Sequence, residues 1–210
     1  GIGGKTGVQM DGVKNCVGAF WQPRCVIIDP NVLSTLDPRQ LRCGLAEAVK
    51  MAACFDSELL DEIVLNGGKD IDRIIHDSLM IKRSVVEQDE RESGLRRALN
   101  FGHTLGHGIE AASGGALLHG ECVALGMLPM SAGTAKEKII SALRAVGLDT
   151  SINITPELRC AILDAVSHDK KSASGGIRII TVDKPGRYGE SIETAEQLGE
   201  RLDRTFAVQT

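Results

Sequence analysis

The stretch LRRALNFGHTLGHGIEAASGGALLHGE, residues 95–121, decides how the rest of the chain is interpreted, because it holds three of the five histidines. Residues 98–112 lack proline and place apolar side chains at helical spacing, so we predict a helix there. His103 and His107 would then lie one turn apart on one face. The small residues 113–116 can form a turn that returns His119 to that face. Converging imidazoles suit a metal ion or proton transfer, although two histidines one turn apart can also be an ordinary polar face.

The composition is that of a soluble globular protein of 210 residues, with 42% apolar and 25% charged residues. A net charge of −4 and an aromatic content of 3% argue against a nucleic-acid surface. No apolar run approaches the length of a membrane span, and there is no signal peptide. The six cysteines form no CxxC pair, which indicates reduced thiols and a cytoplasmic protein. The chain opens GIGGKT without methionine, so we expect it to be part of a longer protein.

The first thirty residues are read as strands and turns. Residues 1–18 are rich in glycine and predict a hairpin. Gly4-Lys5-Thr6 resembles the end of a phosphate-binding loop, but the long helix that follows such a loop is missing. An alternative is a loop that offers Lys5, Lys14 and Asn15 to an anion. Residues 24–29, RCVIID, predict a buried strand that ends at Pro30.

Helical patterns dominate the remainder, so the predicted fold class is mainly α with a few strands near the two ends. The first predicted helix begins at Pro38 and places Glu47 and Lys50 three residues apart among apolar neighbours, which favours a site over a surface ion pair. We predict helices over residues 39–55, 56–65, 70–87, 119–146 with a kink or division at Pro129, 156–167 and 193–206, a strand over 177–182, and turns over 87–94 and 184–190.

Two chemical features follow from these residues. Glu47, His103 and His119 make a set of two imidazoles and a carboxylate, which suits a catalytic Zn²⁺ ion with positions left open. Cations near such a metal would favour a carboxylate- or phosphate-bearing substrate, although lysines and arginines are also common on solvated surfaces. The candidate cations are Lys5, Lys14, Lys50, Lys82, Arg96, Lys170 and Lys171.

Several motifs, taken together and in order, resemble the 3-dehydroquinate synthases of the sugar-phosphate cyclase superfamily. The LNFGHTLGH and LHGE blocks, with their spacing, are the most specific of them. The motifs are GGKTGV (3–8), KN (14–15), AFWQP (19–23), GLAEAVK (44–50), DERESGLRRALNFGHTLGHGIE (89–110), LHGE (118–121) and DKK (169–171). The similarity weakens after Lys171.

The resemblance implies a two-domain α/β enzyme whose N-terminal half binds NAD and whose helical C-terminal half binds metal and substrate. Residues 1–37 would be remnant strands and loops of the nucleotide-binding domain, and residues 38–210 the helical domain. The N-terminal NAD domain would thus be a missing partner, and the 210 residues alone are expected to be inactive. The full-length enzyme is expected to form a homodimer.

The resemblance also implies roles for particular residues. Glu47, His103 and His119 would bind Zn²⁺ or Co²⁺, and His107 would contact substrate instead of metal. The other substrate-contacting positions would be Lys50, Lys82, Arg96, Asn100 and either Lys170 or Lys171. Lys5 and Asn15 would lie where the active site meets the nucleotide domain, Lys14 on the NAD side, and Thr35 and Leu36 near the adenosine of NAD.

The implied reaction is the phosphate-eliminating cyclisation of 3-deoxy-D-arabino-heptulosonate 7-phosphate to 3-dehydroquinate, with NAD and zinc as cofactors. Two alternatives stay open. One is another cyclase of the superfamily, acting as a 2-deoxy-scyllo-inosose, valiolone-type or aminodehydroquinate synthase. The other is a folded metal-binding domain without turnover.

Overall fold

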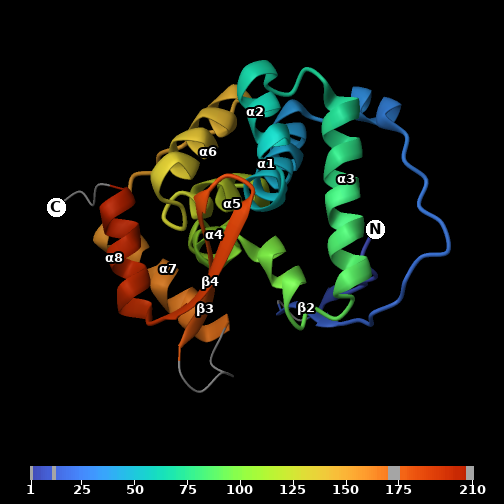
Figure 1. Ribbon diagram of the computed structural model, residues 1–210. Coiled ribbons are helices and arrows are strands. Elements are labelled where there is room, and N and C mark those ends of the chain that lie inside the picture. The colour runs from blue at the N-terminus through green and yellow to red at the C-terminus, as the bar shows by residue number, and fades with distance from the viewer. Residues whose placement is uncertain (1, 11–12, 170–175, 207–210) are drawn as a thin grey trace.

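The computed structural model describes residues 2–10, 13–169 and 176–206 and confirms a mainly helical fold (Figure 1). Its strands pair into two separate antiparallel hairpins, β1 with β2 and β3 with β4. In chain order the elements are β1 (Val8–Met10), β2 (Val13–Val17), the 3₁₀ helix η1 (Pro30–Thr35), α1 (Pro38–Phe55), α2 (Ser57–Asn66), α3 (Ile71–Gln88), the 3₁₀ helix η2 (Leu95–Asn100), α4 (His103–Ala112), α5 (His119–Met127), α6 (Gly133–Ala145), α7 (Pro156–Asp169), β3 (Ile177–Lys184), β4 (Arg187–Glu193) and α8 (Ala195–Thr205).

Helix α1 is the central element, with α3 beside it in Figure 1 and further contacts to α2, α5 and α6. Asp37 caps its first turn by accepting a hydrogen bond from the Arg39 amide, and Pro38 occupies the first helical position. The small side chains of Ala46 and Ala52 are fully buried and let neighbouring helices approach closely. Glu47 and Lys50 therefore project from a helix that neighbouring helices fix in place.

The predicted helix over residues 98–112 is wrong at its start. Residues 95–100 form the short helix η2, and α4 begins only at His103. Between them Gly102 has a φ of +76°, in the left-handed region that favours glycine, so the chain changes direction there. The break lets Phe101 enter the core, where it is fully buried, and makes His103 the first residue of a new helix.

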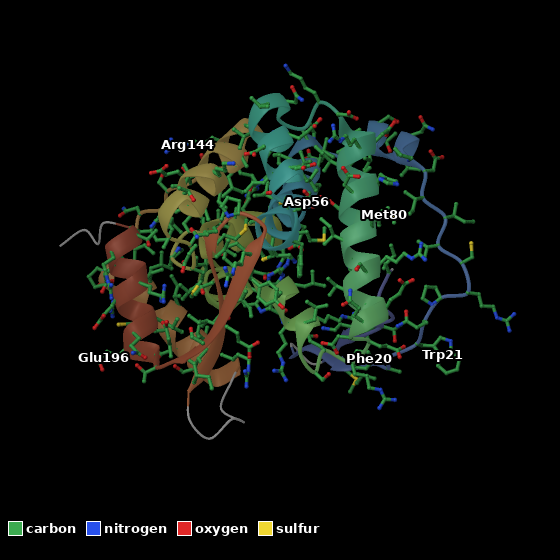
Figure 2. All side chains as sticks on the ribbon, in the orientation of Figure 1. Phe20, Trp21, Asp56, Met80, Arg144 and Glu196 are labelled. Carbon is green, nitrogen blue, oxygen red and sulfur yellow. The ribbon has the colours of Figure 1, made fainter. Side chains whose placement is uncertain are left out.

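The predicted buried strand over residues 24–29 is also wrong. This segment has neither helix nor strand, and Ile27 is 89% exposed. Figure 1 shows it as a loop that passes outside α3, and Trp21, labelled in Figure 2, lies at the edge of the molecule. In the part of the chain that the structure describes, no strand lies beside the segment. A lone strand cannot satisfy its backbone hydrogen-bonding groups, which explains the extended loop.

Two further expectations concern the second half of the chain. The predicted division at Pro129 is confirmed, because α5 ends at Met127 and α6 begins at Gly133. The predicted turn over residues 184–190 is too long, since the turn comprises only Pro185 and Gly186 and β4 begins at Arg187 and pairs with β3. The resulting hairpin contacts α1, α6 and η2, so it forms one wall of the site described below. Among the described residues, no helix is both long and apolar enough to cross a bilayer.

Candidate metal and substrate site

Three helices bring a carboxylate and three imidazoles together. Glu47 projects from α1, His103 and His107 from α4, and His119 from the first position of α5. One nitrogen from each imidazole lies within 4.8 Å of the others. Glu47 Oε1 lies 3.5 Å from His103 Nε2 and 3.7 Å from His119 Nε2.

The carboxylate oxygen at the centre of this cluster is the strongest sign of a cation site. Glu47 Oε1 is buried and, within the part of the chain that the structure describes, has no hydrogen-bond partner. A buried oxygen without a partner is costly, and two imidazole nitrogens stand at distances too long for hydrogen bonds. Two nitrogens and one carboxylate oxygen are ligands that Zn²⁺ and Co²⁺ accept, so the residues present fit such an ion.

Neighbouring groups orient each of the three side chains that the resemblance marked as ligands. His103 Nδ1 lies 3.1 Å from the Phe101 carbonyl oxygen, which can only accept, so Nδ1 donates and Nε2 carries the lone pair of the neutral ring. His119 Nδ1 lies 3.0 Å from Glu110 Oε2. Lys50 Nζ donates to Glu47 Oε2 at 2.6 Å. Such outer contacts fix the ring orientation and the free nitrogen of a metal-binding histidine.

The electrostatics also favour the metal-binding forms. Burial lowers the pKa of His103 to about 3, assisted by the charge of Lys50 and opposed by that of Glu47. Burial alone would raise the pKa of Glu47, but the charges of Lys50 and His103 lower it to about 2. Near neutral pH the imidazole is therefore neutral and the carboxylate ionised, as metal ligation requires.

A cavity of about 490 Å³ opens beside the imidazoles. Three of the residues predicted from sequence, Asn100, His103 and His107, line this cavity, and all three come from η2 and α4. It is also lined by residues that the sequence analysis did not select, namely Arg91, Glu92, Arg97, Thr104, Arg178 and Ile180. Two of these, Arg178 and Ile180, come from β3, where the resemblance is weak.

The predicted cations of α1, α3 and η2 lie around the same cluster. Lys50 is only 5% exposed, which excludes the surface ion pair. Lys82 is half-buried, and burial together with the charge of Lys50 lowers its pKa. Arg96 is buried, and its guanidinium donates to the Gly3 carbonyl oxygen at 2.7 Å and to that of Glu90. Arg96 thus also ties the N-terminal residues to η2.

Glu92 is the residue that sequence reasoning missed most clearly. It receives hydrogen bonds from both Lys5 Nζ and Asn100 Nδ2, so it joins two predicted site residues from distant parts of the chain. Its φ of +62° is unusual for a residue other than glycine. The predicted exposed turn over residues 87–94 is therefore wrong in part, and Asp89 within it is buried. A run of charges resembles solvated surface, and only its place within the family-like motif over residues 89–110 indicated otherwise.

The structure describes only some of the residues that were predicted to lie near the nucleotide. Lys14 and Asn15 belong to β2, but their side chains lie outside what the structure describes, as do Lys170 and Lys171 entirely. Thr35 ends η1, and the next residue, Leu36, lines an apolar cavity of about 250 Å³ between η1, α1 and α3. This cavity shares no lining residue with the one beside the imidazoles.

Two family models match the chain in succession, the 3-dehydroquinate synthase N-terminal model over residues 1–43 and the C-terminal model over residues 44–172. The 3-dehydroquinate synthase of Enterococcus faecalis is 42% identical over 202 residues, which cover 89% of this chain and 56% of the relative. That of Streptococcus sanguinis is 40% identical over 201 residues, with coverages of 88% and 56%. The chain spans about half the length of these curated relatives.

Solved structures of two cyclases have a similar fold. The 2-epi-5-epi-valiolone synthase of Streptomyces hygroscopicus, with NAD⁺ and Zn²⁺ bound, superposes with a TM-score of 0.76 at 27% identity, covering 98% of this chain and 62% of that one. A 2-deoxy-scyllo-inosose synthase with carbaglucose-6-phosphate, NAD⁺ and Co²⁺ superposes with a TM-score of 0.79 at 22% identity, covering 95% and 61%. The second likeness concerns the fold alone.

Proposed function

The chain belongs to the 3-dehydroquinate synthase family, and on that premise we propose that it supplies the metal- and substrate-binding part of a 3-dehydroquinate synthase. The enzyme would convert 3-deoxy-D-arabino-heptulosonate 7-phosphate into 3-dehydroquinate by eliminating phosphate and closing a carbon ring. The observation that carries the proposal is the unpartnered Glu47 Oε1 facing the Nε2 atoms of His103 and His119. It supports a metal centre within a chain whose relatives at 40–42% identity are 3-dehydroquinate synthases.

In this proposal Glu47, His103 and His119 hold Zn²⁺ or Co²⁺. The bound metal would polarise a substrate hydroxyl as a Lewis acid, and NAD would accept and return a hydride. The other steps of binding and orientation would be performed by side chains of this chain. Lys50 keeps Glu47 ionised and oriented through its hydrogen bond to Oε2.

The cations and polar groups around the cavity would bind and orient the substrate. Lys82, which is half-buried, and Arg96, which is buried, would attract its carboxylate and phosphate, because little water competes in such surroundings. His107 and Asn100 line the cavity beside the metal ligands, where they are placed to donate hydrogen bonds and to move a proton. Lys5, held beside the cavity through Glu92, and either Lys170 or Lys171 complete the set in this proposal.

We further propose that residues 1–37 are the part of a nucleotide-binding domain that adjoins residues 38–210. Lys14, Asn15, Thr35 and Leu36 would then contact NAD, with Leu36 lining the apolar cavity. Turnover would need the rest of that domain, so the 210 residues alone would bind metal without catalysis. The complete enzyme would be a cytoplasmic homodimer.

A second candidate is another sugar-phosphate cyclase, which the fold similarity to the valiolone synthase favours at 27% identity. Product analysis separates the two. The 210 residues would be joined to the N-terminal part of the Enterococcus faecalis relative and supplied with NAD⁺, Zn²⁺ and the heptulosonate phosphate. We expect 3-dehydroquinate and inorganic phosphate in equal amounts. A fused enzyme that binds NAD⁺ and Zn²⁺ but gives no 3-dehydroquinate would contradict the first candidate.

The metal assignment is tested separately on the 210-residue chain. We expect Glu47→Ala and His119→Ala to lose most of the bound zinc measured by atomic emission, because each removes one ligand. His107→Ala should keep its zinc, since we assign His107 to the substrate. Undiminished zinc in both of the first two variants would refute the ligand set.

A further inference from the structure

The start of α5 is held by a single arginine from α1. Arg39 donates two parallel hydrogen bonds to Glu121, from Nε to Oε1 and from Nη2 to Oε2, each at 2.7 Å. Nη2 also donates to the Ala116 carbonyl oxygen at 2.9 Å. A planar guanidinium bound to both carboxylate oxygens fixes orientation as well as distance.

Glu121 carries this restraint to the first turn of α5. Its Oε2 accepts a hydrogen bond at 2.8 Å from the amide of Leu118, the residue that caps the helix. Ala116 and Leu118 precede His119 and Glu121 follows it, so one guanidinium restrains the chain on both sides of this histidine. The restraint matters because Gly114 and Gly115, both with positive φ, give the preceding loop little stiffness of its own.

The backbones of α1 and α5 also touch beside the site. A Cβ on Gly120 would lie 2.4 Å from Cys43 Cα and 2.5 Å from its carbonyl oxygen, so only glycine permits this approach. Cys43 lies one turn before Glu47 on α1, and Gly120 directly follows His119. The separation of Glu47 and His119 is therefore set by the backbone contact together with the Arg39–Glu121 pair.

We propose that Arg39 is a positioning residue for the metal centre, which holds the His119 imidazole at the distance from Glu47 and His103 that a metal ion requires. The inference rests on the proposed ligand set. The side-chain hydrogen bonds that Arg39 makes with described residues go to Glu121 and to the Ala116 carbonyl oxygen, so it acts on His119 through Glu121 and the backbone. An exposed ion pair contributes little to folding, so we expect the substitutions to change metal affinity more than the stability of the fold.

The test measures the dissociation constant of Zn²⁺ for the 210-residue chain, by competition with a chelating indicator, and the visible spectrum of the Co²⁺ form. Arg39→Gln and Glu121→Gln should each weaken zinc binding by about 10- to 100-fold, as other losses of outer contacts do. Both should alter the Co²⁺ absorption bands. The double variant should lose little more than either single variant, because both changes break one connection.

Arg39→Lys keeps the charge but cannot bind both carboxylate oxygens, so we expect an intermediate loss of affinity. This milder variant also serves if Arg39→Gln does not fold. Arg204→Gln is the matched control, since Arg204 forms a comparable exposed pair with Glu200 on α8. It should leave zinc affinity and the Co²⁺ spectrum unchanged.

Three outcomes discriminate. Zinc affinity and Co²⁺ spectra equal to the parent chain in the Arg39 and Glu121 variants would overturn the positioning role while leaving the metal site intact. Losses that add fully in the double variant would also overturn it, because the two residues would then act separately. Zinc bound equally well by Glu47→Ala would instead refute the proposed ligand set on which the inference rests.

Discussion

At the scale of single residues, His103 illustrates how position selects a protonation state. Its side chain is only 15% exposed, and its pKa is lowered to about 3 by burial and by the charge of Lys50. An imidazole in the unfolded chain has a pKa near 6.5. The folded chain thus holds His103 neutral, at a free-energy cost that grows wherever the unfolded chain would protonate it.

This difference predicts a pH dependence for the metal-free chain. Because the folded pKa lies below the unfolded value, stability is fully present above about pH 6.5 and falls as the pH drops toward 3. Between pH 6.5 and 4.5 the loss from His103 should reach roughly 2 kcal/mol, measured by urea unfolding with a chelator present. His103→Gln should flatten this slope. His76→Gln, on an exposed part of α3, is the control, and a slope unaffected by His103→Gln would contradict the prediction.

At the scale of elements, the contact between α4 and α5 brings the histidines together. A Cβ on Gly126 would lie 2.1 Å from the Gly102 carbonyl oxygen and 2.6 Å from the Gly106 amide nitrogen. The two helices therefore meet backbone to backbone. His103 and His119, the first residues of the two helices, then have ring centroids 5.4 Å apart, so both side chains can reach one ion.

Gly126→Ala should push α4 and α5 apart. We expect a loss of roughly 1–3 kcal/mol in the free energy of unfolding, despite the better helix propensity of alanine, and weaker zinc binding. Gly44→Ala is the matched control, because Gly44 is also helical but has no atom within 4 Å of an added Cβ. That change should stabilise the chain by about 0.5–1 kcal/mol. Equal unfolding midpoints for the two variants would show that the close contact is absent.

The β3–β4 hairpin contributes Arg178, a cation that lines the cavity, and no metal ligand is proposed from it. Arg178 lines the cavity and pairs with Glu190, whose carboxylate also lies 3.6 Å from Arg97 Nη1. In the fused enzyme, Arg178→Ala should raise the KM for the sugar phosphate by about 10-fold. That is the loss of binding free energy expected when one charge-assisted hydrogen bond is removed. Its zinc affinity should not change. Arg187→Ala, exposed at the turn of the hairpin, should leave KM unaltered, and an equal rise there would exclude a specific contact.

At the scale of the whole molecule, the proposed metal ligands come from α1, α4 and α5, which are separated in sequence but joined through one core. An ion that binds the folded chain alone stabilises it by mass action. At a free Zn²⁺ concentration 100 times the dissociation constant, we expect the thermal midpoint to rise by roughly 5–10 °C. Calorimetry with and without a chelator measures this, and a midpoint that zinc does not move would count against a shared site.

The sequence by itself determined the mainly helical class, the division at Pro129 and the residue types of the site, because helical periodicity, proline and motif spacing are local properties. The tertiary structure decided what depends on distant neighbours. Residues 24–29 have the composition of a strand, but none of the strands in the described ranges lies beside them. The helix predicted from residue 98 is broken at Gly102, where α5 approaches closely. Glu92 and Asp89 look solvated in sequence, yet one joins Lys5 to Asn100 and the other is buried. Burial, pairing and electrostatic environment arise from the whole fold, so local sequence could name the histidines but not arrange them around Glu47.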